Sequence, residues 1–186
     1  MTENTIFGTP LWHIPREETD YNVTETMKEW SLEWQKTDKG IKVSNQVNGY
    51  HSAGSENFNY LPCFYHLKDR LNFLPKFTFT SWWINIQNQG DYNASHNHPE
   101  SDLSFIWYLT DNHNSLVFTK PDYEMTRRRL FMSFKNYNNN PFMLTWNWKC
   151  SAGDILVFPS DTLHHTLTHE KKELRISIAG NLNMII

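Results

Sequence analysis

Cysteine is scarce in this sequence, because Cys63 and Cys150 are its only two and they lie far apart. Neither belongs to a Cys-x-x-Cys pair, and two isolated cysteines are too few for the disulfide framework of a small secreted domain. The sequence also has no run of about 18 apolar residues, which a membrane-spanning helix needs, and its first residues lack the pattern of a secretion signal. We therefore expect a cytoplasmic protein without a membrane partner.

Excess positive charge is missing too. The 17 Lys and Arg residues are outnumbered by 20 Asp and Glu residues, so the formal net charge is -3. Proteins that bind nucleic acids usually present a basic surface, so we expect no nucleic-acid partner. A run of three arginines at 127–129 is the local exception, and a short run of like charge usually forms a solvated surface.

Aromatic residues, by contrast, are abundant, with 8 Trp, 8 Tyr and 12 Phe among 186 residues. Such side chains favour strands and suit a layered sheet core or an aromatic-lined cavity. A chain of this length is expected to form one domain. We predict a single domain over 1–186, with a first strand and two helices in 1–75 and a β-rich core in 76–186.

Two segments of the first part have helical patterns. After a short predicted strand over 6–15, apolar residues recur at helical spacing from Val23 to Trp34, with Asn22 as the predicted N-cap. A second helix is predicted over 62–74, because a proline at 62 suits a first turn and a proline at 75 stops the pattern.

The rest of the chain is dominated by β-branched and aromatic runs between turn residues. The predicted strands cover 76–87, 104–110, 115–119, 142–149, 154–158 and 174–182. A polar stretch at 120–142 has no clean period and predicts a long loop. Helices followed by many strands favour a mainly β fold, a sandwich or barrel with a helical layer.

Histidines cluster in two places. His96 and His98 stand two residues apart before a predicted strand, and an extended chain points such residues to one face. His164 and His165 follow the strand at 154–158. Adjacent side chains of an extended chain point to opposite faces, so only one of the two can point toward a shared metal site. Two close ligands, one distant ligand and a later arginine, Arg175, are what a non-heme iron oxygenase with an oxo-acid cosubstrate requires.

The order of these pieces resembles the 2-oxoglutarate and iron(II)-dependent oxygenase superfamily, in the group with a His-x-His-Pro element, a Phe-Pro-Ser element and an Arg-x-Ser end. The similar pieces are 83–85, 96–99, 104–108, 153–160 with His164, and 175–179. The resemblance implies a double-stranded β-helix, a cupin-like jelly-roll barrel, with the N-terminal helices packed on one sheet. It also implies a hydroxylase in which Fe(II) and dioxygen oxidise a substrate while 2-oxoglutarate becomes succinate.

The metal ligands that the resemblance implies are His96, His98 and His164, with no further catalytic residue. Most of the superfamily has a carboxylate where this sequence has His98, so Glu100 is kept as an alternative ligand. His165 is the alternative to His164, which fits the family spacing better. An all-histidine set would leave more positive charge on the metal than a set with a carboxylate.

Arg175 and Ser177 share a strand face, where the guanidinium can bind the far carboxylate of 2-oxoglutarate bidentately and the hydroxyl can add a hydrogen bond. The alternative is an arginine on an exposed strand face. Asn85, Asn93 and Tyr108 are weaker candidates for cosubstrate contacts, because turn or strand hydrogen bonding explains them equally well. The remaining histidines have no partner by spacing and are expected to be structural or exposed.

Three hypotheses follow. The first is the Fe(II)/2-oxoglutarate oxygenase just described, acting on a small molecule or a protein side chain. The second is a non-catalytic jelly-roll module that binds a metal or ligand, motivated by the missing carboxylate. The third is a three-histidine cupin-type dioxygenase that oxidises a thiol without 2-oxoglutarate. A homodimer is left open by all three.

Overall fold

The structure, a computed structural model, describes residues 1–6, 8–112, 115–120 and 145–185. The arginine run at 127–129 and nearly all of the predicted loop at 120–142 lie outside the described residues, as do His113 and the first residues of the strand predicted at 142–149.

The larger of two main sheets contains seven strands in the order β1-β2-β10-β7-β12-β5-β4, and every pairing is antiparallel. The strands are β1 (Thr2–Ile6), β2 (Thr9–Ile14), β4 (Tyr50–His51), β5 (Phe77–Gln87), β7 (Leu103–Tyr108), β10 (Ile155–Pro159) and β12 (Arg175–Met184). Segments from both ends of the chain therefore share one sheet.

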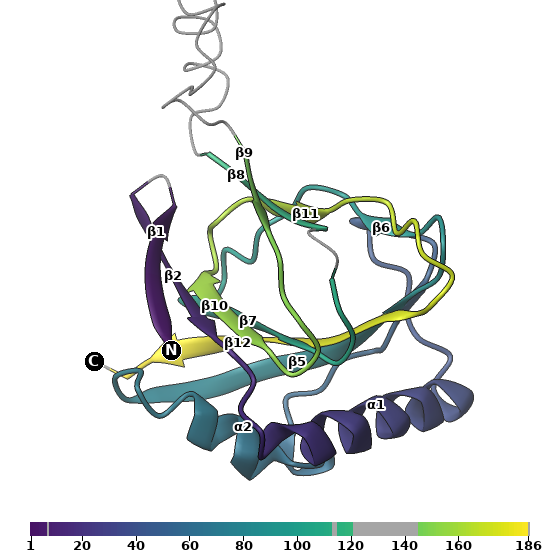
Figure 1. Ribbon diagram of the computed structural model, residues 1–186, viewed down its shortest axis with the longest axis horizontal. Helices are drawn as coiled ribbons and strands as arrows, with labels where there is room; N and C mark the ends of the chain where they lie inside the picture. The colour runs from purple at the N-terminus through teal and green to yellow at the C-terminus, as the bar shows by residue number, and fades with distance from the viewer. Residues whose placement is uncertain (7, 113–114, 121–144, 186) are drawn as a thin grey trace, which may run out of the picture.

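A smaller sheet faces the larger one, as Figure 1 shows. It has the order β11-β8-β9, with β8 at Leu116–Thr119, β9 at Thr145–Trp148 and β11 at His164–Thr166. A short pair, β3 (Gln46–Val47) with β6 (Tyr92–Asn93), lies beside it. The two facing sheets form the predicted jelly roll, a mainly β fold.

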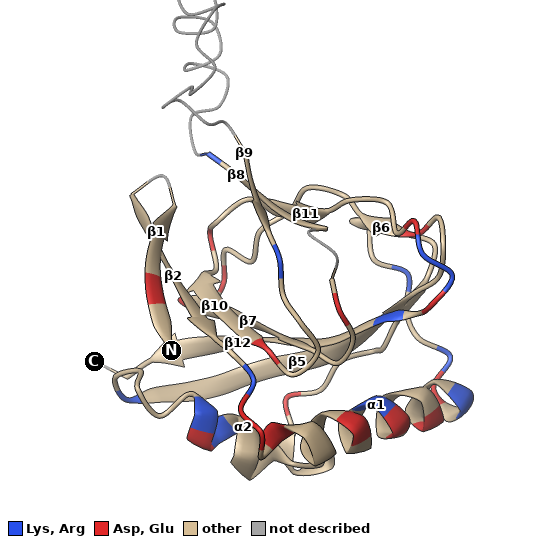
Figure 2. Ribbon diagram, in the orientation of Figure 1, with Lys and Arg blue, Asp and Glu red and all other residues tan. Residues whose placement is uncertain are grey.

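The helices cover the other face of the larger sheet (Figure 1). They are α1 (Asp20–Thr37), the single-turn 3-10 helix η1 (Phe58–Tyr60) and α2 (Phe64–Arg70). None of them combines the length and apolarity that a membrane crossing requires. Figure 2 shows acidic and basic residues along the length of α1.

Both predicted helices exist, but their boundaries were wrong. The N-cap of α1 is Thr19 rather than Asn22, and the Asp20 side chain accepts a hydrogen bond from the Glu17 amide at 2.7 Å. The second helix begins after Pro62, because Cys63 takes a left-handed conformation with φ of 58°, and it ends at Arg70. Contacts with the neighbouring loops set these ends, and the apolar period of the sequence does not reveal such contacts.

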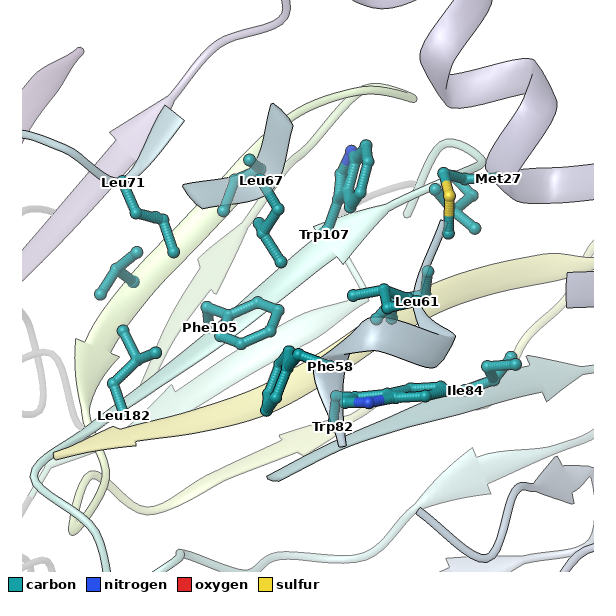
Figure 3. Close-up of a cluster of buried hydrophobic side chains, with 14 of the residues drawn as sticks. Met27, Phe58, Leu61, Leu67, Leu71, Trp82, Ile84, Phe105, Trp107 and Leu182 are labelled. Carbon is teal, nitrogen blue, oxygen red and sulfur yellow. The ribbon is translucent and has the colours of Figure 1, made fainter. Parts of the chain in front are cut away.

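The main core lies between the helices and the larger sheet, where Figure 3 shows Met27 and Leu67 on either side of Trp107, and Trp82 belongs to the same cluster. Each of these side chains is at most 1% exposed. Burying one large apolar side chain stabilises a fold by about 1.5–3 kcal/mol. This layer anchors the sheet whose opposite face carries the candidate site.

Candidate metal centre and cosubstrate pocket

Three histidines from two segments of the chain meet between the two sheets. His96 and His98 follow β6, and His164 opens β11; their ligand atoms all lie within 4.8 Å of one another. The backbones of His96 and His164 exchange two hydrogen bonds of 2.9 Å. The amide of His98 donates to the carbonyl of Ser160 at 2.7 Å. Backbone pairing therefore sets the spacing of the three rings before any ion binds.

Hydrogen bonds orient two of these rings. Nδ1 of His96 lies 2.8 Å from the carbonyl oxygen of Ala94, and Nδ1 of His164 lies 2.8 Å from that of Thr162. A carbonyl only accepts, so each Nδ1 carries the proton and each Nε2 keeps a free lone pair. Such partners are what a metal-binding histidine usually has.

The three imidazoles are neutral at neutral pH. Burial, followed by the charge of His96, lowers the pKa of His164 to about 3. Burial together with neighbouring histidines lowers the pKa of His98 to about 4, and burial also lowers the pKa of His96. A neutral imidazole is the form that binds a metal ion.

The alternative ligands lie apart from this group. Glu100 is exposed, and its carboxylate is not among the ligand atoms that cluster with His96. His165 is half-buried and likewise outside the cluster, as expected for the neighbour of His164 in an extended strand. The geometry brings His96, His98 and His164 together and leaves the two alternatives out.

A cavity of about 370 Å³ opens beside the histidines. Alternate residues of three strands of the larger sheet form its wall: Trp83, Asn85 and Gln87 of β5, Ser104, Ile106 and Tyr108 of β7, and Arg175, Ser177 and Ala179 of β12. All three histidines line the same cavity. Among the described residues of its wall, Arg175 is the only one with a permanently charged side chain.

Arg175 is 3% exposed and held by three neighbours. Its Nε donates to Oε1 of Gln87 at 2.7 Å, and its Nη2 donates to Leu167 O at 3.0 Å and to Thr166 Oγ1 at 3.3 Å. Burial lowers its pKa to about 10, so it stays charged at neutral pH. The remaining nitrogen, Nη1, is buried without a hydrogen-bond partner.

A buried guanidinium nitrogen without a partner is costly, so it marks a place for an acceptor. Two other buried polar atoms of the wall, Oδ1 of Asn85 and Oγ of Ser115, also lack a partner. Nη1 of Arg175 and the Ser115 hydroxyl can each donate a hydrogen bond to an acceptor such as a carboxylate.

The weaker candidates also lie at this cavity. Ser177 and Tyr108 line it, and Tyr108 is hydrogen-bonded to Asn112, while burial raises the pKa of its phenol. Asn93 lines it as well, and its Oδ1 accepts a hydrogen bond from Nε2 of Gln87. Asn93 therefore contacts Gln87, the same side chain that accepts a hydrogen bond from Arg175.

Several lining residues were missed in the sequence, among them Gln87, Ser115, Thr166 and His51. Gln87 stands two positions after Asn85 on a strand, so the period of two could have found it. The same period could have found Trp83, two positions before Asn85, whereas Thr166 and His51 gave no such signal. His51 was expected to be structural or exposed, yet it lines the cavity and stacks on Trp83 with ring centroids 5.8 Å apart.

A family model described as "Putative 2OG-Fe(II) oxygenase" matches residues 81–181, which contain every residue of the candidate metal and cosubstrate sites. No curated protein matches the chain.

Several solved structures share the fold. The non-heme alpha ketoglutarate dependent carbocyclase SnoK from nogalamycin biosynthesis is 16% identical, with a TM-score of 0.64 over 94% of this chain and 79% of that one. HygX from Streptomyces hygroscopicus, with nickel and 2-oxoglutarate bound, is 12% identical, with a TM-score of 0.61 over 96% and 84%. EctD from S. alaskensis is 13% identical, with a TM-score of 0.62 over 94% and 72%.

Proposed function

Because this chain belongs to the 2OG-Fe(II) oxygenase family, we propose that it is a hydroxylase in which His96, His98 and His164 hold Fe(II) and Arg175 binds 2-oxoglutarate. The family uses Fe(II) and 2-oxoglutarate. The cavity offers three imidazoles as ligands for the ion and the guanidinium of Arg175 as a hydrogen-bond donor for the carboxylate. When bound, the ion supplies the redox chemistry by which dioxygen and 2-oxoglutarate yield succinate, carbon dioxide and an oxidised substrate. The protein contributes ligands, orientation and exclusion of water.

The three imidazoles support this role because they are neutral and pre-oriented. The carbonyls of Ala94 and Thr162 hold the Nδ1 protons of two rings, so the Nε2 lone pairs are available without a change of tautomer. Neutral ligands leave the full charge of the ion in the cavity, which strengthens its attraction for the carboxylate of a bound 2-oxoglutarate.

The observation that carries the proposal is the unsatisfied Nη1 of Arg175, which lines the same cavity as the three histidines. Nη2 already donates to Leu167 and Thr166, so Nη1, rather than the whole fork, supplies the hydrogens for the far carboxylate. The hydroxyls of Ser177 and Ser115 line this cavity and can add hydrogen bonds. Gln87 and Leu167 fix the guanidinium as positioning residues.

The test is formation of succinate from 2-oxoglutarate by the full chain with Fe(II), ascorbate and dioxygen. We expect succinate to form, and we expect His164→Ala to abolish it because one ligand is lost. His165→Ala is the matched control, since it removes the adjacent imidazole that lies outside the cluster, and it should retain turnover. Glu100→Ala should retain turnover for the same reason.

Titration with 2-oxoglutarate separates this proposal from the other two hypotheses. Binding and turnover favour the hydroxylase, whereas oxygen uptake with small thiols and without 2-oxoglutarate favours the cupin-type dioxygenase. An intact, iron-loaded protein that neither binds 2-oxoglutarate nor converts it would contradict the proposal. The non-catalytic binding module would then be the favoured hypothesis.

A further inference from the structure

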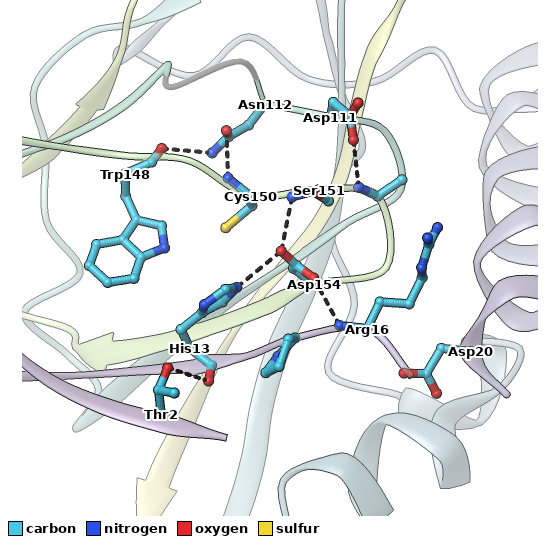
Figure 4. A network of polar contacts seen from close by, with 12 residues as sticks. Thr2, His13, Arg16, Asp20, Asp111, Asn112, Trp148, Cys150, Ser151 and Asp154 are labelled. Atoms are coloured by element: carbon cyan, nitrogen blue, oxygen red, sulfur yellow. Dashed lines mark hydrogen bonds and ion pairs between the residues drawn. The ribbon is translucent and has the colours of Figure 1, made fainter. Parts of the chain in front are cut away.

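A second group of side chains of the types that bind metal ions lies outside the cavity. His13 comes from β2, and Cys150 and Asp154 both precede β10, with Asp154 directly before the strand; the ligand atoms of the three lie within 4.8 Å of one another. Figure 4 shows the three side chains converging. None of them lines the cavity. The oxygenase site therefore gives them no role.

Asp154 is an ionised carboxylate in a buried place. It accepts hydrogen bonds from the Arg16 amide at 2.8 Å and the Ser151 amide at 2.9 Å, and its Oδ2 lies 3.0 Å from Nε2 of His13. Burial acts to raise the pKa of Asp154, but the hydrogen bonds from His13 and the two amides outweigh burial and lower it. Asp154 thus holds a negative charge, and His13 is the basic side chain with which it forms an ion pair in the described part of the chain.

Cys150 is 1% exposed, and burial, followed by the charge of Asp154, raises the pKa of its thiol. A thiol held protonated in this way is a poor nucleophile. A Cys-His-Asp arrangement for covalent catalysis is therefore disfavoured here. Metal binding is different, because a bound cation displaces the thiol proton and reverses the effect of the carboxylate.

Trp148 supplies a further observation. Its ring meets the ring of His13 edge to face with centroids 5.8 Å apart, and its indole Nε1 is buried without an acceptor. In Figure 4 the nitrogen edge of the indole is turned toward the Cys150 sulfur and the His13 ring. A thiolate at Cys150 would be a better acceptor for this N–H than the neutral thiol is.

We propose that His13, Cys150 and Asp154 form a second metal site, for a divalent cation of the zinc class. A sulfur, an imidazole nitrogen and a carboxylate oxygen are the ligands that zinc takes, and a water molecule completes the usual four. The side chain of His13 is 22% exposed, which leaves an approach for the ion and the water. The softer sulfur distinguishes this site from the three-imidazole site.

Binding requires a defined loss of protons. The Cys150 thiol releases its proton to solvent, and His13 binds through Nε2 as the neutral tautomer protonated on Nδ1. The ion then replaces the His13–Asp154 hydrogen bond at 3.0 Å. The site would link the β1–β2 hairpin to the start of β10, which pairs with β2 through Ile155 and Ile14.

Titration of the metal-free full chain with Co²⁺ tests the proposal, because only a thiolate ligand gives a sulfur-to-cobalt charge-transfer band in the near ultraviolet. We expect that band, with up to two equivalents of Co²⁺ bound. Cys150→Ser should abolish it. Cys63→Ser is the matched control, since it removes the only other thiol, and it should retain the band.

His96→Ala with His164→Ala removes the oxygenase ligands and should leave the charge-transfer band unchanged, so failure of the proposed hydroxylase and failure of this site are distinguishable. His13→Ala keeps the thiol but should weaken Co²⁺ binding at this site at least about tenfold. Circular dichroism verifies that each variant is folded. Absence of the band in the parent protein, or its survival in folded Cys150→Ser, overturns the proposal.

Discussion

Trp82 and Trp83 are neighbours in β5, yet they belong to different environments. Trp82 is 1% exposed and packs against Trp30 and Trp34 of α1, with ring centroids 5.8 Å away in both pairs. Trp83 faces the cavity and lies 5.3 Å from the His98 ring. The alternation continues along β5, where Ile84 is buried in the core and Asn85 lines the cavity.

The contrast shows how one sheet serves two purposes. Its helix-covered face buries apolar side chains, and this burial stabilises the fold. Its cavity face contains polar atoms without partners, such as Nη1 of Arg175 and Oδ1 of Asn85, each of which costs about 1–3 kcal/mol. The stable face offsets the cost of the functional face.

Trp82→Ala should have the largest effect, because it empties a fully buried place in the core. We expect the free energy of unfolding to fall by about 3–5 kcal/mol, measured by urea denaturation. Trp83→Ala makes the same change one residue along the strand and should cost less than half as much. Equal losses of unfolding free energy in the two variants would show that both faces of the sheet contribute equally to stability.

Arg175→Lys addresses the cavity face. The charge remains, but the planar group that carries Nη1 is lost, so 2-oxoglutarate should bind about tenfold to a hundredfold more weakly, roughly 1.5–3 kcal/mol. Calorimetric titration measures the affinity. Iron binding should be unchanged, and Arg70→Lys, which alters an arginine that pairs with Glu17 away from the cavity, should leave the affinity as it is. Unchanged binding in Arg175→Lys would contradict the assigned role.

Acid should destabilise the metal-free protein through the cavity histidines. Burial lowers the pKa of His164 to about 3 in the folded state, whereas the unfolded value is about 6.5. Between these values the unfolded chain binds a proton that the folded chain does not, so stability is full above pH 6.5 and falls as the pH drops. The contribution of His164 is on the order of 1 kcal/mol per pH unit. Urea denaturation from pH 7 to 5 measures it, and an equal slope in His164→Gln would refute it.

The smallest effect is expected from Gln87→Met, which removes the acceptor that orients Nε of Arg175. The affinity for 2-oxoglutarate should fall about threefold to tenfold, roughly 0.5–1.5 kcal/mol. Its neighbour Ile86 faces the core, so Ile86→Val should cost about 0.5–1.5 kcal/mol of stability and leave the affinity unchanged. A loss of affinity in Ile86→Val of the same size would remove the distinction between the faces.

Much of the fold was predictable because it rests on local patterns. The apolar period of α1 was found to within three residues at each end, and the β-rich run of β5 to within one. The predicted start of α1 was wrong, because it is the side chain of Asp20, not that of Asn22, that accepts a hydrogen bond from a backbone amide of the preceding turn. Sequence spacing also indicated the shared face of Arg175 and Ser177, but not that Thr166 and Leu167 occupy Nη2.

By itself, the sequence determined the alternation of strand residues, the ordered histidine and arginine motifs, and the resemblance that follows from them. Only the tertiary structure decided which segments meet. The two-way backbone pairing of His96 with His164, and the contact of His13 with Asp154 across 141 positions, depend on strand register between distant segments. Register is set by the packing of whole sheets, so no local period reveals it.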